Sequence, residues 1–318
     1  MIGKILATVA ITAGAGVLGY KFIGKKLFES VLTKKAIKNM RDSESGGPPE
    51  EIETFVTDET YQNGKYWYKN ATKERVEIDS SLGDKILADV FKNENNSDMW
   101  AIICHGFVSI PSDMGQFGAS FAKKGFNVLL PTMRGHGESP CEYTGMGWIE
   151  RLDILKWIDY IVKQNPNAKI VLHGVSMGAA CVLMTTGEKL PSNVVCAIAD
   201  CAFSSVWDEF STQIKVKYKL PAFPFLDAAN DEFKRRSGFN LKDASSVEQV
   251  KKSVTPTLFI HGDKDDFVPF NMLDKIYDAA ACEKEKYVVE GAGHAVSAMV
   301  AGDAYGEKVE KFVNKYIN

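Results

Sequence analysis

Residues 169–186 read KIVLHGVSMGAACVLMTT, and this stretch decides the fold. It opens with an apolar run at 169–172, which predicts a buried β-strand, and it ends with a helix-forming segment at 179–186. Between them the pentapeptide GVSMG, residues 174–178, carries a serine between two glycines. A sharp turn from a strand into a helix exposes such a serine hydroxyl, and the glycines let neighbouring chain segments pass closely. The stretch therefore predicts a strand, a tight turn and a helix, with Ser176 as candidate nucleophile.

Compact apolar runs of the same kind recur along the chain. They lie at residues 99–104, 127–130, 169–172, 194–199, 257–260 and 286–289. Most are separated by helix-length segments, and apolar strands that alternate with helices indicate a mostly parallel sheet covered on both faces. Two alternating runs before them, at residues 75–80 and 85–93, predict an opening hairpin. The predicted fold class is α/β, with a mostly parallel central sheet flanked by helices.

The interval between residues 200 and 255 breaks this rhythm, because it is too long for one crossover helix. It is rich in aromatic residues: Phe203, Trp207, Phe210, Tyr218, Phe223, Phe225, Phe233 and Phe239. We therefore predict an inserted helical cap at about residues 203–250. An insertion at this point of the chain lies above the carboxyl ends of the strands, where Ser176 is exposed. We expect Trp207 and Phe210 to contact a substrate there.

A serine nucleophile needs a base, and His294 is the predicted one. It lies in the flexible GAGHA loop after the last predicted strand. The other four histidines directly precede glycines and are more simply interpreted as hydrogen-bonded loop residues: His105, His136, His173 and His261. A carboxylate must orient the imidazole, and the segment HGDKDDFVP offers three, Asp263, Asp265 and Asp266. The resulting order of serine, aspartate and histidine accompanies a nucleophile on a strand-to-helix turn.

Four motifs in this order resemble the α/β-hydrolase superfamily over about residues 75–318. They are HGF at 105–107, RGHGES at 134–139, the GVSMG turn, and HGDKDDFVP with the late GAGH. The cap makes the chain similar to the branch that includes monoglyceride lipases and serine aminopeptidases. The segment GMGW at 145–148, with the helix-like run after it, also resembles a group of membrane-anchored hydrolases of Gram-positive bacteria.

This resemblance implies a role for each site residue. Ser176 is the nucleophile, His294 the base, and Asp265 the acid, because the acid is the fifth residue of the family's HGxxDxxVP pattern. The backbone N–H groups of Phe107 and Met177 are the implied oxyanion donors. HGF stands where one lipase group has HGGG, so we do not carry over the substrates of that group.

The activity so implied is that of a serine hydrolase, which cleaves carboxylic esters through an acyl-enzyme. A serine aminopeptidase or amidase, or an acyltransferase, on the same triad is the alternative, and a non-catalytic membrane protein with this fold is a further one. The cap aromatics favour an apolar acyl or aryl group. A peptidase would need an acidic subsite for the substrate amine, for which the cap offers Asp227, Asp231 and Glu232.

The first 50 residues differ from the rest. Residues 5–23 are apolar apart from Lys21 and about long enough to cross a bilayer, so we predict that residues 1–24 form a membrane anchor or a cleaved signal. The GxGxxG pattern at residues 14–19 lacks the strand and the acidic residue of a dinucleotide site. Residues 24–41 predict a basic amphipathic helix on a membrane surface, and residues 42–50 a linker, which leaves 51–318 as the catalytic domain. The side of the membrane stays open.

Composition excludes some classes of binding partner. With 38 basic and 41 acidic residues the net charge is −3, which argues against bulk binding of nucleic acid. The six cysteines show no CxxC spacing and are interpreted as reduced core thiols. The sequence shows no metal-ligand cluster and no phosphate loop, so we expect no cofactor and a small acyl ester or a peptide-like molecule as substrate.

Overall fold

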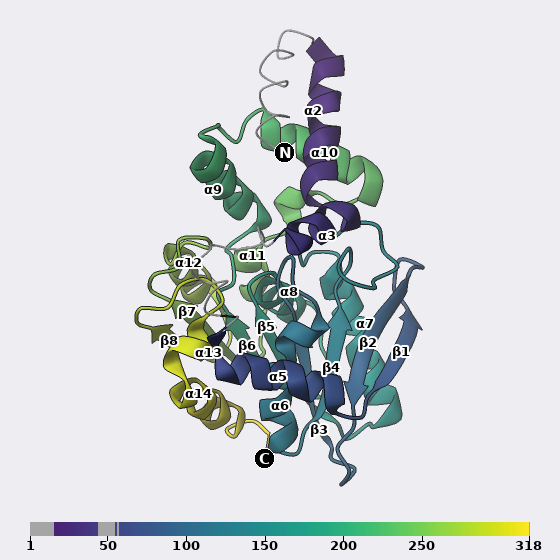
Figure 1. Ribbon diagram of the computed structural model, residues 1–318, viewed down its shortest axis with the longest axis vertical. Helices are drawn as coiled ribbons and strands as arrows, with labels where there is room; N and C mark the ends of the chain where they lie inside the picture. Colours follow the sequence, from purple (N-terminus) through teal and green to yellow (C-terminus); the bar gives the residue numbers. More distant parts are fainter. Residues whose placement is uncertain (1–15, 44–54, 56, 318) are drawn as a thin grey trace.

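An eight-stranded sheet forms the centre of the computed structural model, which describes residues 16–43, 55 and 57–317. The strands lie in the order β1-β2-β4-β3-β5-β6-β7-β8 (Figure 1). They are β1 (Glu74–Asp79), β2 (Lys85–Phe91), β3 (Met99–Cys104), β4 (Asn127–Thr132), β5 (Lys169–Val175), β6 (Val194–Asp200), β7 (Thr257–Gly262) and β8 (Lys284–Val289). β2 pairs antiparallel with both β1 and β4, and the other neighbours are parallel. The predicted hairpin and the predicted mostly parallel sheet are confirmed.

Helices cover both faces of the sheet, which explains why its central strands, β3 to β7, are mostly apolar and buried. One face packs against α7 (Glu150–Gln164), α8 (Met177–Thr186), α11 (Ser246–Val250) and α12 (Asn271–Ala279). The other packs against α5 (Glu59–Asn70), the 3-10 turn η1 (Pro111–Met114), α6 (Gly115–Lys123), α13 (Ser297–Ala301) and α14 (Asp303–Val313). Within β3, Trp100 and Ile102 face the first layer and Ala101 and Ile103 the second. Helix α5 was not predicted from the sequence.

The cap lies above the carboxyl ends of the strands, in the segment that follows β6 (Figure 1). It consists of α9 (Val206–Tyr218), α10 (Phe225–Ser237) and the 3-10 turn η2 (Leu241–Asp243). An isolated bridge joins Ser205 to Ser245, and the Val206 N–H donates to the Ala244 carbonyl over 2.9 Å. The chain thus leaves the central domain and returns to it at adjacent points, as an insertion does.

The basic segment at residues 24–41 differs from its prediction, because it belongs to two helices instead of one. α2 (Gly16–Val31) and α3 (Lys34–Asp42) meet at Thr33, whose hydroxyl caps α3 by accepting from the Ala36 N–H. The break is fixed to the central domain by hydrogen bonds from the Lys34 N–H to the Glu142 carbonyl and from the Thr144 N–H to the Leu32 carbonyl.

The apolar face of these two helices packs on protein, which corrects the interpretation of that face as a membrane-surface helix. α2 packs against α10 and crosses it at a large angle (Figure 1). The approach at Gly24 is so close that a Cβ atom there would lie 2.1 Å from the Ala228 carbonyl oxygen. Phe28 and Leu32 are almost completely buried in the main core. Among the described residues, no helix combines the length and the apolar character that crossing a bilayer requires. Residues 1–15 and most of the predicted linker lie outside the described residues.

Candidate active site

Ser176 lies at the turn between β5 and α8, in a conformation that non-glycine residues rarely adopt, with φ 56° and ψ −119°. The two glycines of the pentapeptide make this turn sterically feasible. A Cβ atom on Gly174 would lie 2.2 Å from the Gly178 carbonyl oxygen, and one on Gly178 would lie 2.1 Å from the Cys104 carbonyl oxygen. The strand-turn-helix arrangement predicted from the sequence therefore forms, with the Ser176 side chain at the carboxyl edge of the sheet.

A chain of hydrogen bonds joins the three predicted catalytic residues. Ser176 Oγ lies 2.8 Å from His294 Nε2, and His294 Nδ1 lies 2.8 Å from Asp265 Oδ2. The other oxygen of Asp265 accepts the N–H groups of Phe267 and Val268, which fixes the carboxylate. Since the Nδ1–H of His294 is donated to Asp265, Nε2 is left to accept a proton from Ser176.

The Asp265 carboxylate and the protonated His294 imidazole stabilise each other inside the protein. Burial alone would raise the pKa of Asp265, but the His294 charge and hydrogen bonds from His261 and His294 hold it below its ordinary value. Burial alone would likewise lower the pKa of His294, but the Asp265 carboxylate raises it well above its ordinary value. Asp265 is thus a carboxylate throughout the neutral range, placed to stabilise an imidazolium.

The loop after β3 lies against the nucleophile, where an oxyanion site would be. A Cβ atom on Gly106 would lie 3.4 Å from the Cβ of Ser176. Val108 next to Phe107 has φ 66°, and its N–H donates to His136 Nε2 over 3.1 Å. The Met177 N–H is at the first turn of α8 and is not used by a helix carbonyl. The loop that carries Phe107 thus lies beside Ser176, and Met177 directly follows Ser176 in the chain.

A second clamp on this loop comes from the N-terminal helices. Arg41 of α3 donates to the Val108 carbonyl over 3.0 Å and forms a two-pronged ion pair with the buried Asp113, over 2.8 and 3.1 Å. Asp113 also accepts from Ser109 Oγ and from the Ile110 N–H, each over 3.0 Å. The loop conformation is therefore fixed from both sides of Val108.

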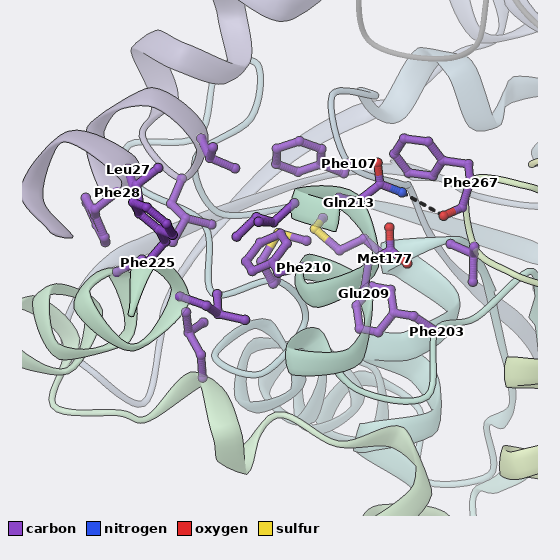
Figure 2. A pocket seen from close by; sticks show the side chains of 18 of the residues that line it. Leu27, Phe28, Phe107, Met177, Phe203, Glu209, Phe210, Gln213, Phe225 and Phe267 are labelled. Atoms are coloured by element: carbon purple, nitrogen blue, oxygen red, sulfur yellow. Dashed lines mark hydrogen bonds between the residues drawn. The ribbon is translucent and has the colours of Figure 1, made fainter. Parts of the chain in front are cut away.

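An apolar cavity of about 170 Å³ opens at Ser176 and extends beneath the cap (Figure 2). Of the described residues that line it, Ser176, Glu209 and Gln213 have polar side chains and the rest are apolar. Gln213 donates to the Phe267 carbonyl over 2.7 Å, and Glu209 is buried. The cavity is thus suited to an apolar group attached to the reacting carbon.

The family model for the alpha/beta hydrolase fold matches residues 102–224. The uncharacterized protein YqkD of Bacillus subtilis is 30% identical over 214 residues, which cover 67% of this chain and 70% of that protein. The chain belongs to the α/β-hydrolase fold family. The uncharacterized protein Rv2307c of Mycobacterium tuberculosis is 23% identical over 215 residues, 67% of this chain and 69% of that protein.

Solved structures agree with this α/β-hydrolase fold. The esterase Pf2001 of Pyrococcus furiosus superposes with a TM-score of 0.63 at 22% identity and covers 78% of this chain and 94% of that one. The acylaminoacyl peptidase of Pyrococcus horikoshii superposes with a TM-score of 0.57 at 16% identity and covers 79% of this chain and 43% of that one. At these identities the likeness concerns the fold.

The two predicted substrate contacts of the α/β-hydrolase differ in position. Phe210 lines the cavity, whereas Trp207 is not among the described residues that line it, so contact between Trp207 and a substrate stays a prediction. The Trp207 ring packs instead under Lys242 of η2, whose Nζ lies 4.2 Å from the ring centroid.

The other four histidines are engaged away from the reacting atoms. His105 and His136 each accept one backbone N–H, from Met133 and Val108 respectively, over 3.1 Å. Burial lowers the pKa of His105 to about 4 and that of His136 to about 3, so both stay neutral. His173 lies near the Tyr305 hydroxyl, and His261 contacts Asp265 behind the triad.

Two residues near the site were missed from the sequence. Cys201, directly after β6, has φ 51°, and its sulfur lies within 4.8 Å of ligand atoms of Asp265 and His294. These three side chains could hold a metal ion by composition, but burial raises the pKa of the Cys201 thiol to about 11, and the other two form the triad. Glu209 of the cap is the second, a buried acidic residue that lines the cavity among the cap's apolar side chains.

Proposed function

We propose that this chain is a serine hydrolase that cleaves carboxylic esters through an acyl-enzyme. The observation that carries the proposal is the hydrogen-bonded chain from Asp265 through His294 to Ser176, which ends on a strained turn at the mouth of an apolar cavity. A buried carboxylate, an imidazole held in one tautomer and a serine hydroxyl in contact with it are the parts that acyl transfer needs.

The geometry supports the following sequence of steps. His294 Nε2 takes the proton of Ser176 Oγ as this oxygen bonds to the acyl carbon, and the carbonyl electron pair moves onto its oxygen. The N–H groups of Phe107 and Met177 stabilise that oxyanion. Its collapse breaks the bond to the alkoxide, which leaves with the proton from His294. Water then gives a proton to His294 and its oxygen to the acyl carbon, which releases the acid and restores Ser176.

A peptidase or amidase on the same triad is the second candidate, and Glu209 favours it. This buried carboxyl group lines the cavity and is suited to bind a substrate amine. The three acidic residues expected to do so are engaged on the cap: Asp227 with Lys242, Asp231 with Tyr20, and Glu232 with Arg235 and Arg236. Because the remaining lining is apolar, we favour the ester.

The decisive experiment compares Ser176→Ala with Ser97→Ala, a serine at the opposite, amino-terminal end of the strands. Ser176→Ala should lose labelling by a fluorophosphonate probe and lose p-nitrophenyl acetate hydrolysis by at least about 10³-fold. Ser97→Ala should keep both. Equal labelling of the Ser176→Ala protein would refute the assignment. Faster turnover of aminoacyl anilides than of the matched esters would favour the peptidase.

We also propose that the apolar N-terminal run attaches the protein to a membrane, with the side left open. The proposal rests on the apolar sequence of residues 5–19. The end of the apolar run is not part of it, because Tyr20 and Ile23 contact α10. Membrane fractionation of the full chain and of a variant lacking residues 1–15 tests this. A full-length chain recovered entirely in the soluble fraction would refute it.

A further inference from the structure

The cavity extends away from the nucleophile as far as the N-terminal helix α2. Figure 2 shows Met177 and Glu209 at one end, Leu27 and Phe28 of α2 at the other, and Phe210 between them. The far end is thus closed by α2, which precedes the sheet in the sequence, together with α10 of the cap, which lies between β6 and β7. The α2 part of this wall is made by residues that come before the first strand.

The position of His294 determines which part of an ester lies in the cavity. His294 must give a proton to the leaving oxygen, so the leaving group lies on its side of the acyl carbon. His294 is not among the described residues that line the cavity, and its ring packs on Phe267, with 4.9 Å between ring centroids. Phe267 lies at the Met177 end in Figure 2, and Met177 directly follows Ser176 in the chain. The cavity that extends from this end towards α2 is therefore left for the acyl chain.

The lining and the size of the cavity define the acyl group. The α2 contribution, Leu27, Phe28 and Val31, is entirely apolar, so a polar or charged acyl chain would lose its hydrogen bonds to water without replacement. An apolar cavity of about 150 Å³ admits a six-carbon ring, and this one measures about 170 Å³. An acyl chain of at least about six carbons fits this space.

We propose that α2 is the end wall of an acyl-binding cavity and that the substrate is an ester of a medium-chain, apolar carboxylic acid. The inference rests on the proposed function, because it places the acyl carbon at Ser176. Leu27 is the residue that best tests it, since its side chain lines the far end and is partly exposed, so that substitution there disturbs the core little.

The experiment measures kcat/KM for p-nitrophenyl esters from acetyl to dodecanoyl and, separately, for acetate esters of alcohols of increasing length. Leu27→Trp fills the far end and Leu27→Ala enlarges it. The matched controls are Leu18→Trp and Leu18→Ala, because Leu18 lies on the same helix and is 81% exposed. Ala229→Leu narrows the cavity from α10 and serves if Leu27→Trp lowers the melting temperature strongly.

Leu27→Trp should lower the octanoyl-to-acetyl ratio of kcat/KM by about tenfold or more, since one methylene group in an apolar pocket discriminates by that factor. Leu27→Ala should move the preferred chain to greater length, and the Leu18 variants should match the wild type. The inference would be overturned if the octanoyl-to-acetyl ratio did not change in the Leu27 and Ala229 variants. It would also be overturned if these variants changed kcat/KM only for the acetate esters of different alcohols. Acetyl-ester hydrolysis that persists in Ser176→Ala would overturn the proposed function itself.

Discussion

Phe28→Ala should destabilise the whole protein, because this residue joins α2 to both the cap and the central domain. Phe28 is 0% exposed. Its ring lies 5.6 Å from that of Tyr143 and 6.3 Å from that of Phe233, and the Arg236 guanidinium lies 4.5 Å from its centroid. Truncating a fully buried phenylalanine costs about 3–5 kcal/mol, a large part of the about 5–15 kcal/mol that stabilises a typical protein.

The same helix offers a control of the same residue type, Phe22, which is 44% exposed. With an unfolding entropy of about 2.1 cal/mol/K per residue, Phe28→Ala should lower Tm by about 5–8 °C. Phe22→Ala should change stability by less than about 0.5 kcal/mol. Circular dichroism during heating and urea unfolding measure both. Equal, small shifts for the two variants would show that α2 does not pack on the protein as described.

Two further predictions concern the catalytic chain and the loop beside it. Asp265→Asn should lower kcat by about 10³-fold or more, whereas Asp263→Asn should cost little. Activity requires neutral His294, so kcat/KM rises as the pH rises through the pKa of His294. Asp265 raises that pKa. In Asp265→Asn the acid limb of kcat/KM should therefore move to lower pH. Arg41→Ala should lower kcat about tenfold with little change in KM, since the Val108 carbonyl loses its donor and the oxyanion loop loosens. An unchanged kcat would assign Arg41 to stability alone.

The sheet and the strand-turn-helix arrangement at Ser176 could be predicted because both depend on local sequence. A strand buried on both faces must be apolar throughout, and the glycines around Ser176 are required by the close approach of Gly178 to the Cys104 carbonyl. The position of Trp207 could not be obtained from its size. Trp207 and Phe210 are three residues apart on α9 and so share one side of the helix, and neither size nor periodicity predicts that Phe210 lines the cavity and Trp207 does not.

The N-terminal helices show a more general limit of sequence patterns. The spacing of Phe28 and Leu32 among lysines correctly indicates that one face of the segment is covered, but periodicity does not say whether lipid or protein covers it. Here protein covers it, because Ala228 and Phe233 of α10 pack on α2 and bury its apolar face. Because the cap presents apolar residues on two sides, towards α2 and towards the cavity, it needs α2 as a partner. The same contact that removes this face from solvent therefore also closes the cavity beside Ser176.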